Sequence, residues 1–177
     1  MKLDHTRLRL AEAQAFVAEH HRHSEPLRRH IFSIGAHQLG IRYPILGVAT
    51  VDHCSSAWSK RTDHVELRRL CTLGDPNVAS FLIGKVSQAV FAIGYRSLIT
   101  YTQPHESGAS LKAAGFWVQK RQKMVRYEDG SVEGGLIQWI RVRDYQPDQE
   151  ERAFTKKVLS ETNAFAGSLE FQGESNG

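Results

Sequence analysis

The sequence predicts a single α/β domain, built on a mixed, twisted sheet flanked by helices. Its 177 residues, 41% hydrophobic and 24% charged, have the length and composition of one soluble globular domain. The central region, residues 64–119, alternates strand-like and helix-like patterns, which is typical of parallel strands joined by helices. Strand-like pairs precede and follow this region, and such pairs are expected to be antiparallel. Parallel and antiparallel pairing together predict a mixed sheet.

The centre of the chain predicts a strand–helix–strand unit. Apolar side chains recur every three or four residues, a spacing that keeps one face of a helix on a core. They are Val78, Phe81, Leu82, Val86, Ala89, Val90 and Ile93. Gly94 follows them, where a helix end is expected. The strand-like runs on either side, residues 65–73 and 97–103, should then be parallel and joined by a right-handed crossover.

The elements before this unit are a helix and a hairpin. Apolar residues on one side of the segment 10–21 predict the helix. Residues 30–38 and 43–54 are rich in β-branched and other apolar side chains, which predicts two strands joined through Gly40.

The elements after the central unit are a second strand pair and a terminal helix. The strands are predicted at residues 118–127 and 136–143, with glycines suited to the turns between them. A weaker apolar pattern predicts a helix over 148–165. The polar, acidic residues 166–177 predict a disordered tail, so the domain is expected to span residues 1–165.

Composition restricts the class of protein. The chain has two cysteines, Cys54 and Cys71, without a CxxC spacing, which predicts a reducing, cytoplasmic setting. No apolar leader and no run long enough to span a bilayer occur, so neither export nor a membrane partner is expected. The net charge of +4 and pI near 9.2 favour polyanions such as CoA phosphates, RNA or DNA, without choosing among them.

The turn at residues 73–79 has two interpretations. The first turn of a helix leaves backbone N–H groups without partners, and these can bind phosphate. Alternatively, Asp75 or Asn77 caps an ordinary helix start with its side chain.

Several blocks of the sequence resemble a known family. The matching residues are Glu66, Arg69–Thr72, Asn77, Gly94–Tyr95, Ile99–Thr102, Glu106, Gly108 and Ser110–Gly115, with Phe16–Val17, His20–His23 and Pro26 upstream. In this order they resemble the GNAT acyltransferases, in particular the GNAT-like proteins of phages and prophages. A fainter resemblance, through Ser80–Lys85 and the run ending at Phe116, is to phage Mom-type DNA-modification proteins.

This resemblance implies a GNAT-like fold that binds acetyl-CoA as co-substrate. The implied cofactor-binding residues lie at the end of the strand and in the loop after it, and are Cys71, Thr72, Gly74, Asn77, Val78, Ala79 and Ser80. Of the three positions that the family marks in this loop, Gly74, Asn77 and Ala79, only the last has the family's residue type.

The resemblance also implies catalytic residues. Glu66 would accept the acceptor's proton as general base, or else form a salt bridge on the sheet face. Strand alternation puts Glu66 on the side of Arg68 and opposite Arg69. The family's usual general acid, a tyrosine, is replaced by Leu111, so Tyr101, Ser110 or Cys71 could protonate the thiolate, or it could leave unassisted.

The histidine segment after the first helix has three interpretations. His20, His21 and His23 would line the acceptor groove, and Arg69 completes the predicted substrate-binding set. With Glu19 or Glu25 the histidines could instead hold a metal, but no strong metal motif is present and no metal is predicted. The third interpretation is an ordinary surface segment.

Together these features predict an acetyl-CoA-dependent N-acyltransferase whose acceptor is a nucleobase in DNA or a small amine. Two rival hypotheses remain. One is a catalytically inactive GNAT-shaped binding module, favoured by the degenerate loop and by Leu111. The other is a nucleic-acid-binding accessory protein that uses the basic strands 120–126 and 141–143.

Overall fold

The computed structural model describes residues 1–20, 27–54, 63–122, 124–126 and 132–173. Within this part the chain folds as two compact units, Met1–Ile99 and Thr100–Gly177. Strand β5 (Ser97–Thr102) passes from the first unit into the second. No helix in the described ranges is long and apolar enough to cross a membrane.

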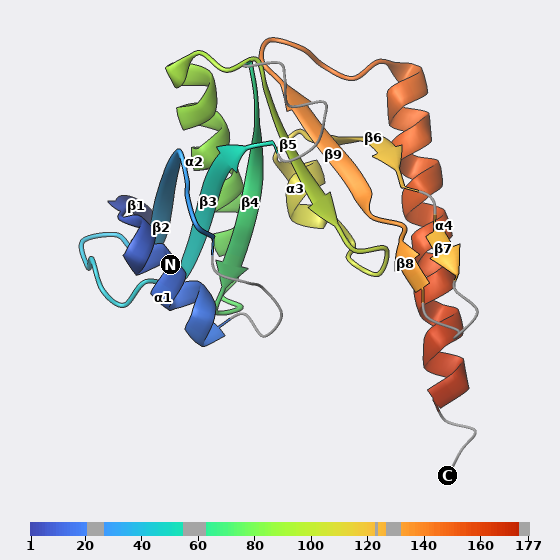
Figure 1. Cartoon of the computed structure of the whole chain (residues 1–177), viewed down its shortest axis with the longest axis horizontal. Helices are drawn as coiled ribbons and strands as arrows, with labels where there is room; N and C mark the ends of the chain where they lie inside the picture. The colour runs from blue at the N-terminus through green and yellow to red at the C-terminus, as the bar shows by residue number, and fades with distance from the viewer. Residues whose placement is uncertain (21–26, 55–62, 123, 127–131, 174–177) are drawn as a thin grey trace. The chain divides into compact units, whose positions relative to one another are not determined.

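The first unit is built on four strands that run antiparallel to their neighbours, followed by one parallel strand (Figure 1). The four are β1 (Leu3–Leu8), β2 (Phe32–Gln38), β3 (Gly47–His53) and β4 (His64–Thr72). Strand β5 pairs with β4 in parallel, from His64 opposite Ser97 to Glu66 opposite Ile99. The predicted parallel pair and the predicted hairpin are both present.

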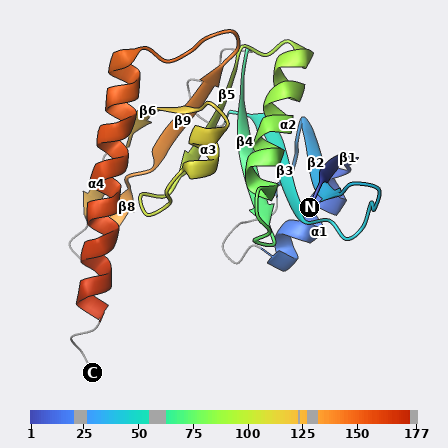
Figure 2. The same ribbon diagram turned by 180° about the vertical axis from the view of Figure 1, so that it is seen from behind.

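Two helices cover opposite faces of this sheet, α1 (Leu10–His20) and α2 (Val78–Ile93) (Figures 1 and 2). Ala13 of α1 packs with Leu8 and Val48. On the neighbouring position of β3, a Cβ added to Gly47 would lie 2.9 Å from the Val78 side chain of α2. Successive strand residues point to opposite faces, so the two contacts define the two sides of the sheet. We call the side covered by α1 the α1 face.

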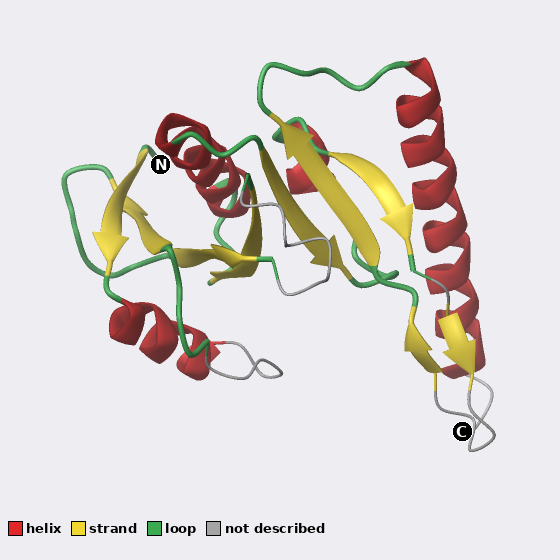
Figure 3. Cartoon of the chain, turned by 45° about the horizontal axis from the view of Figure 1, so that its top comes forward, coloured by secondary structure: helices red, strands yellow, loops and turns green. Residues whose placement is uncertain are grey.

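The described part of the second unit contains two antiparallel strand pairs and two helices (Figure 3). Its elements are α3 (Ala109–Ala113), β6 (Trp117–Arg121), β7 (Met124–Arg126), β8 (Val132–Gly134), β9 (Ile137–Val142) and α4 (Gln149–Gly173). Strands β6 and β9 pair antiparallel, as do β7 and β8. Helix α4 packs along β6, where Thr155 Oγ1 accepts the amide hydrogen of Val118 at 3.0 Å.

Trp139 is the largest fully buried side chain of this second unit. Its Nε1 donates to Thr102 Oγ1 at 2.9 Å. Gly108, with φ of 62°, packs against the ring, since an added Cβ would lie 2.1 Å from it. Only glycine meets both the positive φ and the lack of space at this position.

The strands form a seven-stranded mixed sheet in the order β1-β2-β3-β4-β5-β9-β6, and β7 with β8 form a separate pair. The predicted α/β class, a mixed sheet flanked by helices, is therefore confirmed.

Three element predictions differ from the structure. Strand β1 was not predicted, because its charged residues hide the pattern of an edge strand. The strand predicted over 118–127 is divided into β6 and β7, and a bulge between Val118 and Lys120 bends β6. Helix α4 continues past residue 165 to Gly173, into the stretch predicted to be a disordered tail. A polar composition lowers burial but does not remove helix propensity.

Candidate active site

The β4–α2 loop has the backbone of an open anion site. Asn77, the residue before the helix, is left-handed with φ of 66° and makes no side-chain capping hydrogen bond. Gly74 has φ of 94°, and a Cβ built on it would meet no atom within 4 Å. The first turn of α2 carries no acidic residue. The Val78 amide donates to the Asp75 carbonyl at 3.4 Å. The Asn77 side chain leaves the next N–H groups of this helix start to another partner.

The predicted cofactor-binding residues differ in how their side chains lie. Val78 is fully buried and Cys71 nearly so, and the Val78 amide donates to the Asp75 carbonyl at 3.4 Å, so neither side chain is open to a ligand. Ser80 Oγ donates to the Asn77 carbonyl at 3.1 Å and so supports the turn. Thr72 lies on the α2 side, against Gly47.

Strand β4 carries a β-bulge that changes which side chains share a face. Thr50 pairs with Arg69, but Val51 pairs with Leu67, so Arg68 is an additional residue on β4. Arg68 shares a side with Glu66, because its Nη1 lies 3.5 Å from Glu66 Oε2. The prediction that Glu66 and Arg68 share a side of the strand is confirmed.

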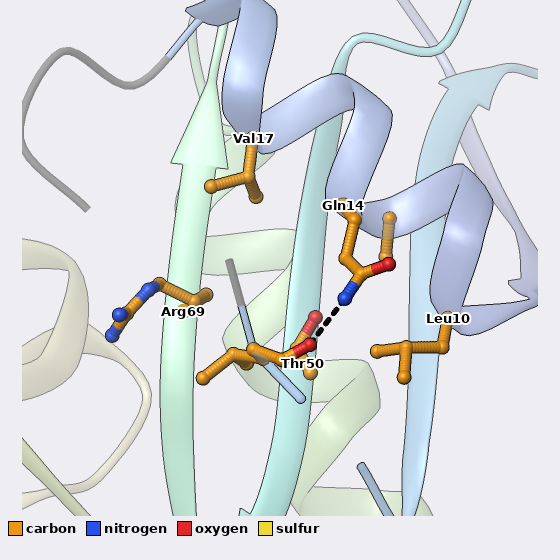
Figure 4. A pocket seen from close by; sticks show the side chains of 7 residues that line it. Leu10, Gln14, Val17, Thr50 and Arg69 are labelled. Carbon is orange, nitrogen blue, oxygen red and sulfur yellow. Dashed lines mark hydrogen bonds between the residues drawn. The ribbon is translucent and has the colours of Figure 1, made fainter. Parts of the chain in front are cut away.

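The prediction that Arg69 lies on the opposite side is wrong, because simple alternation does not hold across a bulge. Arg69 lines a narrow cavity of about 10 Å³ under helix α1, with Thr50 and five other residues (Figure 4). This volume is about that of one water molecule. Its guanidinium points away from Gln14 and Thr50, and its Nη1 donates to the Arg68 carbonyl at 2.8 Å.

Glu66 faces a second buried carboxylate that the sequence analysis missed. Asp52 of β3 is directly opposite Glu66 in the register, and the two side chains are 8% and 10% exposed respectively. Arg29 Nε lies 3.3 Å from Asp52 Oδ2. Two carboxylates at facing positions repel each other, and the two arginines offset that repulsion. Asp52 becomes a candidate only once the pairing of β3 with β4 is known.

Both cysteines are buried thiols. Burial raises the pKa of the Cys54 thiol to about 11, with a further contribution from the charge of Glu66. Burial also raises the pKa of Cys71. A thiol of raised pKa is a poor nucleophile at neutral pH, which argues against a covalent cysteine intermediate.

A hydrogen-bonded chain runs beside the carboxylates. His30 Nδ1 lies 2.7 Å from Ser33 Oγ, which lies 2.9 Å from Thr50 Oγ1. Burial, and then the charge of Arg7, lower the pKa of His30, so this imidazole is neutral at pH 7. No local pattern predicts these hydrogen bonds, since His30 and Thr50 belong to separate segments of the polypeptide.

His20 lies on a different part of the α1 face from Arg69. It lines an open groove of about 750 Å³ between α1 and the segment 43–45, and its ring centroid is 4.6 Å from that of Phe16. His20 therefore lines the open groove, whereas Arg69 lines the narrow cavity. His21 and His23 lie outside the described residues. Within those residues, no three histidine, cysteine, aspartate or glutamate side chains gather as a metal site would require.

Tyr101 and Ser110, the predicted proton donors, belong to the second unit. Tyr101 is half-buried near the end of β5. Ser110 is half-buried in α3, beside the buried Leu111.

Comparisons with known proteins define the fold. No family model and no curated protein matches this sequence. Among solved structures, a putative phosphinothricin N-acetyltransferase aligns with TM-score 0.60 and 12% identity, over 81% of this chain and 100% of that one. A putative acetyltransferase from Salmonella typhimurium, yncA, which holds acetyl-CoA, aligns with TM-score 0.59 and 12% identity over 84% and 99%.

The ribosomal-protein-S18-alanine N-acetyltransferase of Escherichia coli aligns with TM-score 0.56 and 13% identity, over 83% of this chain and 97% of that one. The chain therefore has the GNAT acetyltransferase fold. At this level of identity the likeness is one of fold.

Proposed function

We propose that this protein is an acetyl-CoA-dependent N-acetyltransferase of GNAT type. The observation that carries the proposal is the combination of two features in one strand–loop–helix unit. They are a buried carboxylate on the strand and an open N-terminus on the helix that follows it. Glu66 lies within β4, and β4 ends at the loop that opens α2. The neighbours of this fold, of which one holds acetyl-CoA, support the same conclusion.

The loop residues would hold the cofactor through their backbone. The amides of Ala79 and Ser80 and the dipole of α2 favour a pyrophosphate, and no acidic side chain of the first turn opposes it. Acetyl-CoA supplies the activated acetyl thioester. The amides of Cys71 and Thr72 are candidates to polarise its carbonyl.

Glu66 would accept the proton of the acceptor ammonium, so that the free amine can attack. Direct attack in a ternary complex is favoured over a cysteine intermediate because both thiols are buried and of raised pKa. Tyr101 and Ser110 stay predictions for the group that protonates the leaving thiolate.

Cofactor binding is the first test. Acetyl-CoA at about 100 times its Kd should stabilise the fold by about 2.7 kcal/mol, which corresponds to a rise in Tm of about 5–10 °C. Acetyl-pantetheine, which has the thioester but no pyrophosphate, should give a much smaller rise. Equal effects of the two ligands, or no effect of either, would contradict the proposed role of the loop.

A phage-type origin and a nucleobase acceptor come from the resemblance of the sequence alone. The rival hypothesis of nucleic-acid binding by the basic strands is weakened by two of its residues. Arg121 Nη1 lies 3.3 Å from Glu161 Oε2, and Arg141 is partly buried, which lowers its pKa. These groups are less available to phosphates than exposed cations would be.

A further inference from the structure

The inference concerns Arg68, the additional residue of the β4 bulge. Its side chain is 24% exposed, and its buried Nε has no hydrogen-bond partner in the described part of the protein. The guanidinium lies at the long distance of 3.5 Å from Glu66. A planar group with five N–H donors is well suited to a carboxylate, which it binds in a bidentate manner. Arg68 thus has donor capacity that its recorded ion pair does not use.

The charges around this position favour a ligand without net charge. Each of the facing carboxylates has one guanidinium group as its recorded partner, Arg29 for Asp52 and Arg68 for Glu66. Cys54 and His30 contribute no charge at neutral pH, since the pKa of the thiol is raised and that of the imidazole is lowered. The recorded ion pairs are therefore balanced, and a ligand without net charge keeps this balance.

The spacing of the two groups also restricts the ligand. Arg68 and Glu66 are in direct contact, so a molecule that meets both must carry its anion close to its amine. An α-amino acid has this arrangement, with the two groups on one carbon. A polyamine has only cations, and so offers no acceptor to the unused donors of Arg68.

We propose that the acceptor is an α-amino acid or a similar small zwitterion, whose anionic group binds Arg68 while its ammonium faces Glu66. This inference rests on the proposed function. The ammonium gives a proton to Glu66, and its nitrogen forms a bond to the thioester carbonyl carbon. The C–S bond then breaks, and a second proton from nitrogen ends on the CoA sulfur. The products are the N-acetyl amino acid and CoA.

The test compares matched acceptors with the full chain and labelled acetyl-CoA. Each amino acid is offered as the free acid and as its carboxamide, which keeps the amine and side chain but has no anion. At least one free acid should be acetylated with a kcat/KM about 10- to 100-fold above that of its amide, the range expected for a hydrogen bond to a charged group. The α-amine of the amide loses its proton more readily than that of the free acid, which by itself favours the amide as acceptor. A preference for the free acid is therefore a stringent result.

Variants of Arg68 assign the preference to this side chain. Arg68→Gln should abolish the preference for the acid, and Arg68→Lys should keep part of it, since the charge remains but the planar fork is lost. The exposed Arg96→Gln is the control and should behave as the wild type. The rise in Tm with acetyl-CoA should be the same in all four proteins.

The outcomes separate this inference from the proposed function. Amides or simple amines acetylated as well as free acids would overturn the inference, as would a preference that survives in Arg68→Gln. The inference also fails if label enters only DNA, RNA or larger amines, or if no acceptor reacts while acetyl-CoA still raises Tm. Absence of any effect of acetyl-CoA on Tm overturns the proposed function itself.

Discussion

The two parts of the candidate site on β4 and its following loop are built by different means. At the carboxyl end of β4 the loop into α2 depends on backbone conformation, with left-handed residues at Gly74 and Asn77 and open space around Gly74. Around the bulge at Arg68, within β4, the proposed chemistry depends on the side chains of Glu66 and Arg68. A backbone site tolerates changes of residue type that keep φ, while a side-chain site does not. This difference explains how the loop can depart from the family pattern and still be a candidate phosphate site.

The largest expected effect is at the side-chain end. Glu66→Gln removes the proposed base while keeping the size of the side chain, so kcat should fall about 10²-fold or more. Acetyl-CoA should still raise Tm, since the loop is unchanged. Steady-state kinetics and thermal shifts measure the two quantities separately. If activity and Tm in the absence of ligand fall together, Glu66 is a structural ion pair.

The backbone end should respond to conformation and not to side-chain chemistry. Asn77→Val places a β-branched residue at positive φ, which costs on the order of 1–3 kcal/mol. We expect weaker acetyl-CoA binding, by about 10-fold, because the helix start is displaced. Asn77→Gly is the matched control and should bind acetyl-CoA as the wild type does. Titration calorimetry measures both, and equal loss in the two variants would indicate that the Asn77 amide group itself is required.

The same distinction explains what the sequence could and could not predict. The apolar spacing from Val78 to Ile93, with Gly94 after it, predicted α2 within its observed bounds, because local periodicity reports one buried face. The bulge that brings Arg68 and Arg69 to one face has no local signal, since it arises from the pairing with β3. For the same reason Asp52 became a candidate only through its position opposite Glu66. Side-chain sites of this kind depend on contacts between distant segments.

The smallest expected effect concerns Cys54, beside the two carboxylates, and depends on pH. Its folded-state pKa of about 11 lies above the value of about 8.5 for an unfolded chain. The contribution of the buried thiol to stability is therefore fully present below the unfolded value. It is lost as the pH rises from about 8.5 toward 11, because the unfolded state ionises first.

The wild type should lose more unfolding free energy over this range than Cys54→Ala, whose cost from the removed sulfur does not depend on pH. Urea unfolding at several pH values gives this difference. Because tyrosines and lysines titrate in both proteins, only the difference between the two curves is informative. Parallel curves would mean that the Cys54 thiol ionises as readily in the folded protein as in the unfolded chain. The carboxylates beside it would then lie in a more hydrated setting than their burial indicates.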